Sequence, residues 1–239
     1  MQAKVWFVGA GPGNPELITV KGLSLLREAD VLVYAGSLIN PELIAQSDAP
    51  IKIDSWGMRL DELVAAMEAP AKSGKIVVRL HSGDPCLYGA IIEQIEKLEK
   101  RGVMVEIVPG VSSLFAAAAA LGMQLTLRGV SETLIVTRPA GKTLDHDQIA
   151  ELSAFGTTMA VFLGTEKLRE ITKKLVCPQD TPAVVIYHAS WPDQKIVRGT
   201  VADIAQKAQD EGIEHTALLI FGEVVDPHRK GYTRSYLYS

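Results

Sequence analysis

The chain of 239 residues lacks long apolar runs, has only two cysteines and carries no excess of positive charge. No stretch approaches the roughly 18 uninterrupted apolar residues that a membrane-spanning helix needs. Residues 1–4 lead directly into a short apolar segment instead of a signal-peptide pattern. These absences argue against a membrane protein and a secreted protein, and they predict a cytoplasmic one.

The cysteines and the net charge exclude further classes. Cys86 and Cys177 lie far apart without CxxC spacing, so the sequence predicts neither a zinc site nor a disulfide, and no metal is expected. A formal net charge of -4 gives no general attraction to the phosphates of nucleic acids or of lipids. We therefore expect neither a nucleic acid nor a membrane as partner.

Short apolar segments typical of strands alternate with helical stretches along the whole chain. Strands apolar on both faces and joined by helices form a mainly parallel sheet. The sequence predicts an α/β protein with two α/β domains, residues 1–122 and 123–239, and a ligand cleft between them. The expected strands are 5–8, 31–34, 51–53, 76–80 and 105–108 in the first half, and 133–137, 158–163, 183–187, 195–198 and 217–221 in the second.

A glycine-rich loop, FVGAGPGNPELIT at residues 7–19, follows the first strand. Gly9 and Gly11 fit the dinucleotide pattern G-x-G-x-x-G, but Asn14 stands at the third glycine position. Pro12 also lacks the N–H group that a phosphate cradle would use. Three interpretations stay open at this point: a structural turn, a dinucleotide site, and a site for another ligand.

Two further loops follow strands, RLHSGDPCLYGA at 79–90 and VPGVSSLFAA at 108–117. Ligands of open α/β sheets bind beyond the carboxyl ends of strands, so these loops and the first should face one crevice. Asp84 either contributes to that site or caps a helix beginning near Leu87, while His81 and Tyr88 could position substrate or exchange protons. No nucleophile elbow or HExxH motif occurs, which favours a reaction whose reactive group is carried by a cofactor.

With these loops the sequence resembles the tetrapyrrole methylase family, which uses S-adenosyl-L-methionine to methylate corrin and sirohaem precursors. The resemblance implies the class III methyltransferase fold, two α/β domains with the methyl donor in the cleft between them, and a homodimer. One departure is Asn14, where the family usually has Asp. The segments that carry the resemblance are VGAGPGNPELITVKG at 8–22, VVRLHSGDPCLYG at 77–89, EIVPGVSSLFAAAAALG at 106–122, AVFLGT at 160–165 and TALLIFGEVVDP at 216–227.

The resemblance also implies which residues hold the donor. Those of the first domain should lie under it, bind its methionine or ribose end and line the pocket, and those of the second should enclose its adenine side. The first set is Pro12, Ser82, Gly83, Asp84, Leu87, Ser112 and Ser113, and the second is Leu163, Ala189 and Ala217.

Within the family, residues 33–44, 133–143 and 184–200 are most similar to the branch that methylates C11 of precorrin-4 or its cobalt form in cobalamin (vitamin B12) biosynthesis. Trp191 in the last segment either touches the substrate or covers the core of a hairpin. Because the substrate bears many carboxylates, arginines are expected near it, with Arg79, Arg138 and Arg198 as candidates.

Other functions stay open. A methylase of the same fold could act on another precorrin position, on uroporphyrinogen III, on the diphthamide precursor as a diphthine synthase does, or on rRNA. An NAD-binding oxidoreductase and a binding module without activity are the alternatives from other classes.

Overall fold

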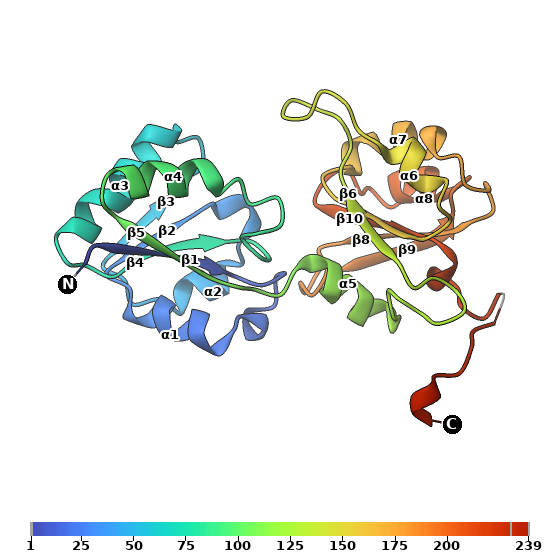
Figure 1. Ribbon diagram of the computed structural model, residues 1–239, viewed down its shortest axis with the longest axis horizontal. Coiled ribbons are helices and arrows are strands. Elements are labelled where there is room, and N and C mark those ends of the chain that lie inside the picture. Colours follow the sequence, from blue (N-terminus) through green and yellow to red (C-terminus); the bar gives the residue numbers. More distant parts are fainter. Residues whose placement is uncertain (1, 230, 239) are drawn as a thin grey trace. The chain divides into compact units, whose positions relative to one another are not determined.

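The computed structural model describes residues 2–229 and 231–238 and divides into two compact units, Met1–Ser113 and Leu114–Ser239 (Figure 1). The prediction of two α/β domains is confirmed, because each unit contains one five-stranded sheet covered by helices. The predicted boundary at residue 122 lies beyond the alanine-rich helix α5 (Ser113–Leu121). Leu114 and Ala117 of that helix pack with Val184 and Ile220, so the structure groups it with the second core. No helix in the described part of the chain has the length and apolarity to cross a bilayer.

The sheet of the first unit is parallel throughout, with the strand order β3-β2-β4-β1-β5. Phe7 pairs with Arg79, and Val8 pairs with Val108, which fixes the registers of β4 and β5 against β1. All five strands therefore have their carboxyl ends on the same side of the sheet. We call this side the carboxyl edge, and the loops that follow the strands lie there. The strands are β1 (Lys4–Gly9), β2 (Val31–Tyr34), β3 (Ile51–Asp54), β4 (Val77–His81) and β5 (Met104–Val108).

Helices cover both faces of this sheet (Figure 1). On one face Leu26 and Leu43 pack against Leu32 and Leu80. On the other face Met67 packs in a cluster with Phe7 and Val77. The first pair of helices is α1 (Val20–Glu28) and α2 (Pro41–Ala45), and the second is α3 (Leu60–Lys72) and α4 (Ile92–Lys100).

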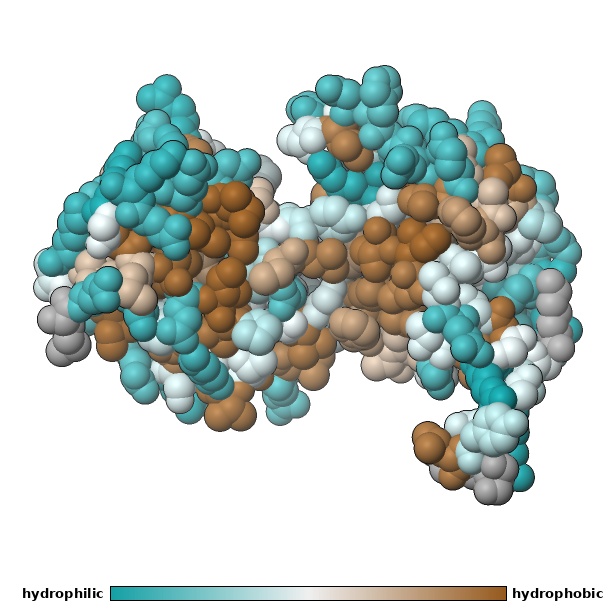
Figure 2. Space-filling model, viewed as in Figure 1, coloured by the Kyte–Doolittle hydropathy of each residue, from teal (hydrophilic) through white to brown (hydrophobic). Residues whose placement is uncertain are grey.

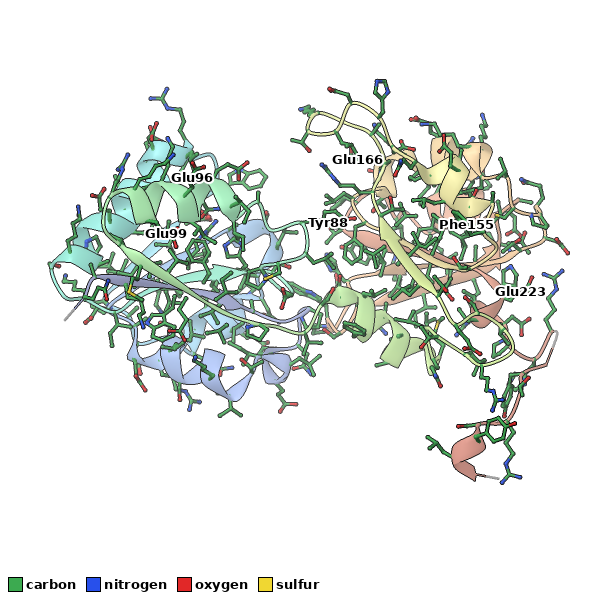
Figure 3. The ribbon with its side chains drawn as sticks, viewed as in Figure 1. Tyr88, Glu96, Glu99, Phe155, Glu166 and Glu223 are labelled. Atoms are coloured by element: carbon green, nitrogen blue, oxygen red, sulfur yellow. The ribbon has the colours of Figure 1, made fainter. Side chains whose placement is uncertain are left out.

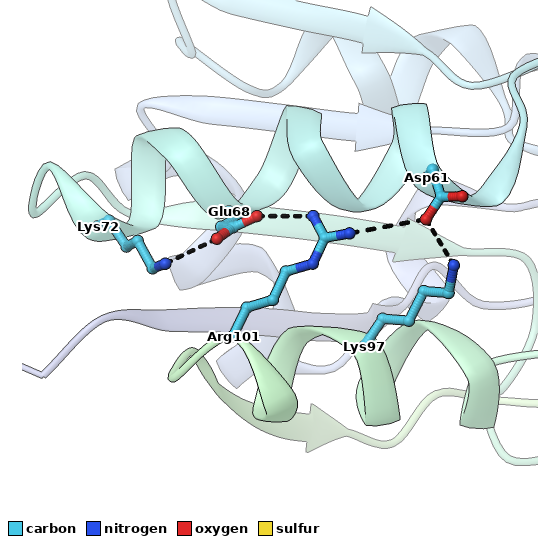
Figure 4. Close-up of polar contacts among 5 residues, drawn as sticks. All are labelled: Asp61, Glu68, Lys72, Lys97 and Arg101. Atoms are coloured by element: carbon cyan, nitrogen blue, oxygen red, sulfur yellow. Dashed lines mark hydrogen bonds and ion pairs between the residues drawn. The ribbon is translucent and has the colours of Figure 1, made fainter.

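A network of charged side chains joins α3 to α4 on their outer side (Figure 4). Lys97 Nζ lies 2.5 Å from Asp61 Oδ1, and Arg101 lies 3.6 Å from Asp61 and 2.8 Å from Glu68. Lys72 bonds Glu68 at 2.7 Å. Hydrogen bonds from Lys97 to Asp61, and from Lys72 and Arg101 to Glu68, lower the pKa of both carboxyls. The network links the two helices on their solvent side, while Met67 and Leu98 pack in the core beneath them.

Edge strand β5 presents a different surface. Figure 2 shows hydrophobic residues gathered over it. Met104 and Ile107 are 39% and 37% exposed. Exposed apolar side chains on an unpaired sheet edge favour association with another surface.

The sheet of the second unit is mixed, with the strand order β6-β7-β10-β8-β9. Strand β10 runs antiparallel to β7 and β8, so the ends of those two strands lie beside the start of β10. Helix α5 packs on one face. The other face is covered by α6 (Ile149–Ser153), α7 (Leu168–Lys174) and α8 (Ile204–Asp210). The strands are β6 (Leu134–Thr137), β7 (Thr158–Val161), β8 (Pro182–Tyr187), β9 (Lys195–Thr200) and β10 (Ala217–Phe221).

Candidate functional site

Three loops meet at the carboxyl edge of the first sheet. Ala10 N–H donates to His81 O at 2.7 Å, and Gly11 and Gly83 exchange two backbone hydrogen bonds at 3.2 and 2.8 Å. These bonds tie the loop after β1 to the loop after β4. The third loop, which follows β5, contacts the other two through Gly110.

Gly9, Gly83 and Gly110 pack backbone against backbone. A Cβ atom on Gly9 would lie 2.5 Å from Gly110 Cα and 2.7 Å from Gly83 O, and one on Gly110 would lie 2.2 Å from Gly83 O. No side chain fits at those distances, so the glycines allow three loops to converge. Gly11 and Gly83 also have φ of +79° and +62°, which a glycine adopts at little cost.

Asp84 joins the second loop to the third. Its Oδ2 accepts from Gly110 N–H at 2.9 Å, and its Oδ1 accepts from Cys86 N–H at 2.8 Å. The helix expected near Leu87 begins instead at Ile92, so the alternative in which Asp84 caps that helix is wrong. Asp84 is a brace between loops.

The rest of the second loop is strained. Tyr88 and Ala90 have φ of +57° and +48°, and a Cβ on Gly89 would lie 2.1 Å from Pro85 O. Tyr88, labelled in Figure 3 on this loop, is 39% exposed. Left-handed non-glycine residues cost of order 1 kcal/mol each and concentrate at functional sites.

The first loop is held by two asparagines. Asn40 is buried and donates through Nδ2 to Gly13 O at 2.9 Å. Asn14 accepts from Glu16 N–H at 2.9 Å, which caps a short 3-10 helix, Pro15–Leu17. The residue that replaces the family's usual Asp thus has a local structural role here.

Six of the seven donor residues expected from the first domain lie on these three loops, and the seventh, Ser113, is the first residue of α5 directly after the third loop. Pro12, Gly83 and Ser112 are buried, Asp84, Leu87 and Ser113 are half-buried, and Ser82 is exposed. The structure therefore brings this part of the predicted set together.

Arg79 and His81 project from the end of β4. Arg79 is 6% exposed and donates through Nη1 to Ser55 Oγ at 3.0 Å, and burial lowers its pKa to about 10. His81 is 9% exposed and stacks on Phe7 with 5.5 Å between ring centroids. Burial, and then the charge of Arg79, lower the pKa of His81 to about 3. A neutral His81 can donate or accept a hydrogen bond, but it is not a proton donor near pH 7.

In the second unit, Leu163, Ala189 and Ala217 share one edge of the sheet. Thr165 Oγ1 donates to Ala217 O at 3.0 Å and accepts from Ala217 N–H at 3.1 Å, while His188 N–H donates to Thr216 O at 3.4 Å. The backbone is left-handed at Leu163, His188, Ser190 and Thr216, with φ between +48° and +74°. This edge thus concentrates strained residues that carry side chains.

Trp191 belongs to an aromatic column beside that edge. His188 stacks on Tyr187 at 3.7 Å and on Trp191 at 5.1 Å between ring centroids. His188 Nδ1 lies 3.0 Å from both carboxylate oxygens of Asp193. Sequence reasoning singled out Trp191 and missed His188 and Asp193, although both lie within three residues of it.

The other two candidate arginines occupy different places. Arg138 follows β6 at the same edge as Leu163 and donates to Thr143 Oγ1 at 2.7 Å and to Thr143 O at 3.1 Å. Arg198 pairs in register with Val184 and donates to Val225 O at 3.4 Å. Its guanidinium thus points to the opposite edge of the sheet, and the structure does not group it with the other candidates.

Known proteins resemble this chain over nearly its full length. A family model described as tetrapyrrole (corrin/porphyrin) methylases matches residues 4–205. The cobalt-precorrin-4 C(11)-methyltransferase of Methanocaldococcus jannaschii is 50% identical, covering 98% of this chain and 92% of its own. An X-ray structure of a cobalt precorrin-4 methyltransferase superposes with a TM-score of 0.91 at 44% identity, covering 94% of this chain and 97% of that one. The uroporphyrin-III C-methyl transferase of Thermus thermophilus, complexed with S-adenyl homocysteine, has a TM-score of 0.78 at 32% identity and covers 93% and 98%.

Proposed function

Because this chain belongs to the tetrapyrrole methylase family, we propose that it transfers a methyl group from S-adenosylmethionine to C11 of precorrin-4 or cobalt-precorrin-4 in cobalamin biosynthesis. The observation that carries the proposal is the relative named for this reaction, which is 50% identical over 98% of the chain. A solved structure named for the same substrate supports it with a TM-score of 0.91.

The loops at the carboxyl edge of the first sheet support the proposal of a bound methyl donor. The loops of the first unit present main chain and small side chains because Gly9, Gly83 and Gly110 pack without Cβ atoms. A nucleoside and an amino acid can approach such a surface closely. The residues that would hold the donor are Pro12, Ser82, Gly83, Asp84, Leu87, Ser112 and Ser113 of the first unit, with Leu163, Ala189 and Ala217 of the second.

The bound donor supplies an electrophilic methyl group on a sulfonium, so the chain need not provide a nucleophile. Its residues bind and orient the two substrates and exclude water. Asp84 contributes by bracing the loops, since each of its carboxylate oxygens accepts a backbone N–H.

Substrate positioning falls to the polar and aromatic residues near the strand ends: Arg79, His81, Tyr88, Arg138 and Trp191. His81 acts as a neutral hydrogen-bonding group, because burial keeps its pKa at about 3. Arg198 is left out of this set because its guanidinium bonds Val225 O at the far edge of the second sheet.

The first loop argues against the oxidoreductase alternative. In a dinucleotide site the glycine turn opens directly into a helix whose N-terminal N–H groups face pyrophosphate. Here the 3-10 helix Pro15–Leu17 intervenes and α1 begins only at Val20. The glycines instead pack against the other loops.

The proposal is tested with purified protein, methyl-labelled S-adenosylmethionine, and precorrin-4 with and without cobalt. We expect one labelled methyl group at C11 in the carbon-13 spectrum of the product, and tight binding of S-adenosylhomocysteine by calorimetry. Labelling of another position would assign a different methylase, and the absence of both binding and transfer would overturn the proposal. Comparing the two substrates shows which form of the pathway the enzyme serves.

The protein is also proposed to be a homodimer. Its family resemblance supports this, as do the exposed Met104 and Ile107 on edge strand β5. Sedimentation equilibrium at micromolar concentration tests it, and a monomer of 25.8 kDa would contradict it.

A further inference from the structure

Among the described residues of the first unit, three buried polar atoms have no hydrogen-bond partner: Arg79 Nε, His81 Nε2 and Gln94 Oε1. Their side chains are buried, with exposed fractions of 6%, 9% and 6%. Buried polar groups are paired in the great majority of cases, so three orphaned atoms in one unit require an explanation. We call these three residues the β4 polar cluster.

The members of the β4 polar cluster lie on one side of the sheet. Arg79 and His81 alternate with Leu80 along β4, so they share the face of Val77, which packs in the cluster of α3 and α4. Gln94 follows Ile91 by three residues and precedes Leu98 by four, which places it on the helix face that packs on this same side. Gln94 Nε2 donates to Ala90 O at 3.0 Å, so the amide oxygen Oε1 is the atom of this side chain that lacks a hydrogen bond within the described residues.

Asp54 attracts the Arg79 guanidinium electrostatically but forms no ion pair with it. Within the described residues, no carboxylate oxygen lies within 4.0 Å of the Arg79 guanidinium. The neighbouring Asp54 accepts instead from the N–H groups of Gly36 and Trp56 at 3.1 and 2.9 Å. A buried guanidinium that forms no ion pair is costly, and an anionic ligand in contact with it would reduce that cost.

The loops around the end of β4 provide an apolar surface next to this charge. Ser55, which accepts from Arg79, is followed by Trp56, which is 74% exposed. Strained Tyr88 is 39% exposed on the loop that connects β4 to α4. Exposed aromatic rings on these loops suit a flat ligand, and the buried cation of β4 suits an acidic substituent of that ligand.

We infer that the β4 polar cluster binds a carboxylate side chain of the tetrapyrrole, with Arg79 as the charged partner and His81 as a second donor through Nε2–H. Gln94 is a positioning residue whose Oε1 accepts an N–H of the guanidinium in the complex. The inference rests on the proposed function for the identity of the substrate, and it assigns the part of the first unit that selects an acidic macrocycle.

The test compares Arg79→Met with Arg27→Met, which removes an exposed arginine from α1 of the same unit. Equilibrium binding of precorrin-4 and of S-adenosylhomocysteine is measured for each variant, together with the melting temperature. We expect Arg79→Met to raise the Kd for precorrin-4 by about tenfold or more, the effect of one charge-assisted hydrogen bond. Its Kd for S-adenosylhomocysteine should stay within about twofold of wild type, Arg79→Lys should recover part of the loss, and Arg27→Met should bind both ligands normally.

The melting temperature separates binding from structure. Because Arg79 is buried and forms no ion pair within the described residues, replacing it with an apolar side chain of similar length should leave the melting temperature unchanged or raise it. The inference is overturned by an unchanged Kd for precorrin-4, by a parallel loss of both ligands, or by a large fall in melting temperature.

A spectroscopic readout tests His81 without turnover. In protein labelled with nitrogen-15 histidine, precorrin-4 should shift the His81 Nε2 resonance, assigned by its absence in His81→Gln, whereas S-adenosylhomocysteine alone should not. An unmoved His81 resonance at saturating precorrin-4 would remove His81 from the site. If the enzyme binds precorrin-4 in an Arg79-dependent way but methylates a position other than C11, the proposed function fails and this inference stands.

Discussion

The two sheet edges that carry the candidate residues are built in opposite ways. At the edge of the first unit, Gly9, Gly83 and Gly110 let three loops touch through their backbones. At the edge of the second unit, Leu163, His188 and Thr216 hold left-handed backbone without being glycine. Where its three loops converge, the first edge needs the absence of side chains, and only its loop after β4 shares with the second edge left-handed residues that carry side chains, Tyr88 and Ala90.

The difference indicates what each edge contributes. A surface of packed loop backbones offers close approach and main-chain hydrogen bonds. A surface of strained residues offers particular side chains, and the strain persists because the surrounding bonds, such as those between Thr165 and Ala217, hold the backbone in place. Adding a Cβ where the three loops of the first edge meet should therefore lower the free energy of unfolding. Removing a side chain from a left-handed residue of the second edge should raise it.

The largest effect is expected from Gly110→Ala. The new Cβ would lie 2.2 Å from Gly83 O and 2.7 Å from Gly9 Cα, so backbone must move. We expect a loss of about 3 kcal/mol or more in the free energy of unfolding, at the upper end of overpacking. Denaturant titration measures the loss, and calorimetry should show that binding of S-adenosylhomocysteine is abolished.

Gly141→Ala is the matched control in the second unit. A Cβ there meets nothing closer than Lys167 Nζ at 3.8 Å. Its unfolding free energy should therefore stay close to that of wild type. Equal losses in Gly110→Ala and Gly141→Ala would show that the convergence of the loops does not depend on these glycines.

Asp84→Ala tests the brace between the loops of the first edge. It would leave Gly110 N–H and Cys86 N–H without their acceptor, at a cost of about 1–3 kcal/mol in unfolding free energy. Affinity for S-adenosylhomocysteine should fall as the loops loosen, while Asp84→Asn, which keeps one acceptor oxygen, should lose less. Wild-type affinity in Asp84→Ala would contradict the bracing role.

The sequence was sufficient to predict these loops but not their mutual contacts. Apolar runs and glycine turns located the strands and placed Pro12, Gly83 and Ser112 at one edge, because parallel strands end together. Which glycine meets which loop is a tertiary property. The sequence left open whether Asp84 caps a helix, because its actual partner, Gly110 N–H, lies 26 residues away.

Helix α5 and Arg198 show two other limits. The alanine-rich segment is apolar all around, so periodicity does not indicate which core it joins, and the structure packs Leu114 and Ala117 with the second sheet. The strand of Arg198 was predicted, but the partner of its guanidinium, Val225 O, depends on the tertiary fold. Gln94 carried a usable signal, since a polar residue spaced three and four positions from Ile91 and Leu98 falls on a buried helix face.

Because His81 is buried as a neutral ring in the first unit, the free energy of unfolding should fall in acid. Its pKa is about 3 in the folded protein and near 6.5 when unfolded, so the unfolded state binds more protons between these values. Stability should therefore fall as the pH drops below about 6.5, by about 1 to 2 kcal/mol from this group by pH 5. His81→Gln should reduce that fall in urea titrations at the two pH values, and an identical pH dependence in both proteins would show that His81 is not buried as a neutral ring.

The smallest effect is expected at the second edge, from Thr216→Gly. Thr216 is β-branched, exposed and left-handed at φ +55°, so glycine should relieve strain and raise the unfolding free energy by about 1 kcal/mol. Glu214, two residues earlier, is exposed and does not have a left-handed backbone. Glu214→Gly should therefore lower stability through the entropy of the unfolded chain. The change in unfolding free energy is determined from denaturant midpoints for both variants. A gain for Thr216→Gly and a loss for Glu214→Gly would demonstrate that the second edge holds its side chains on a strained backbone. If both substitutions destabilise the protein, the two edges do not differ in the way their backbones indicate.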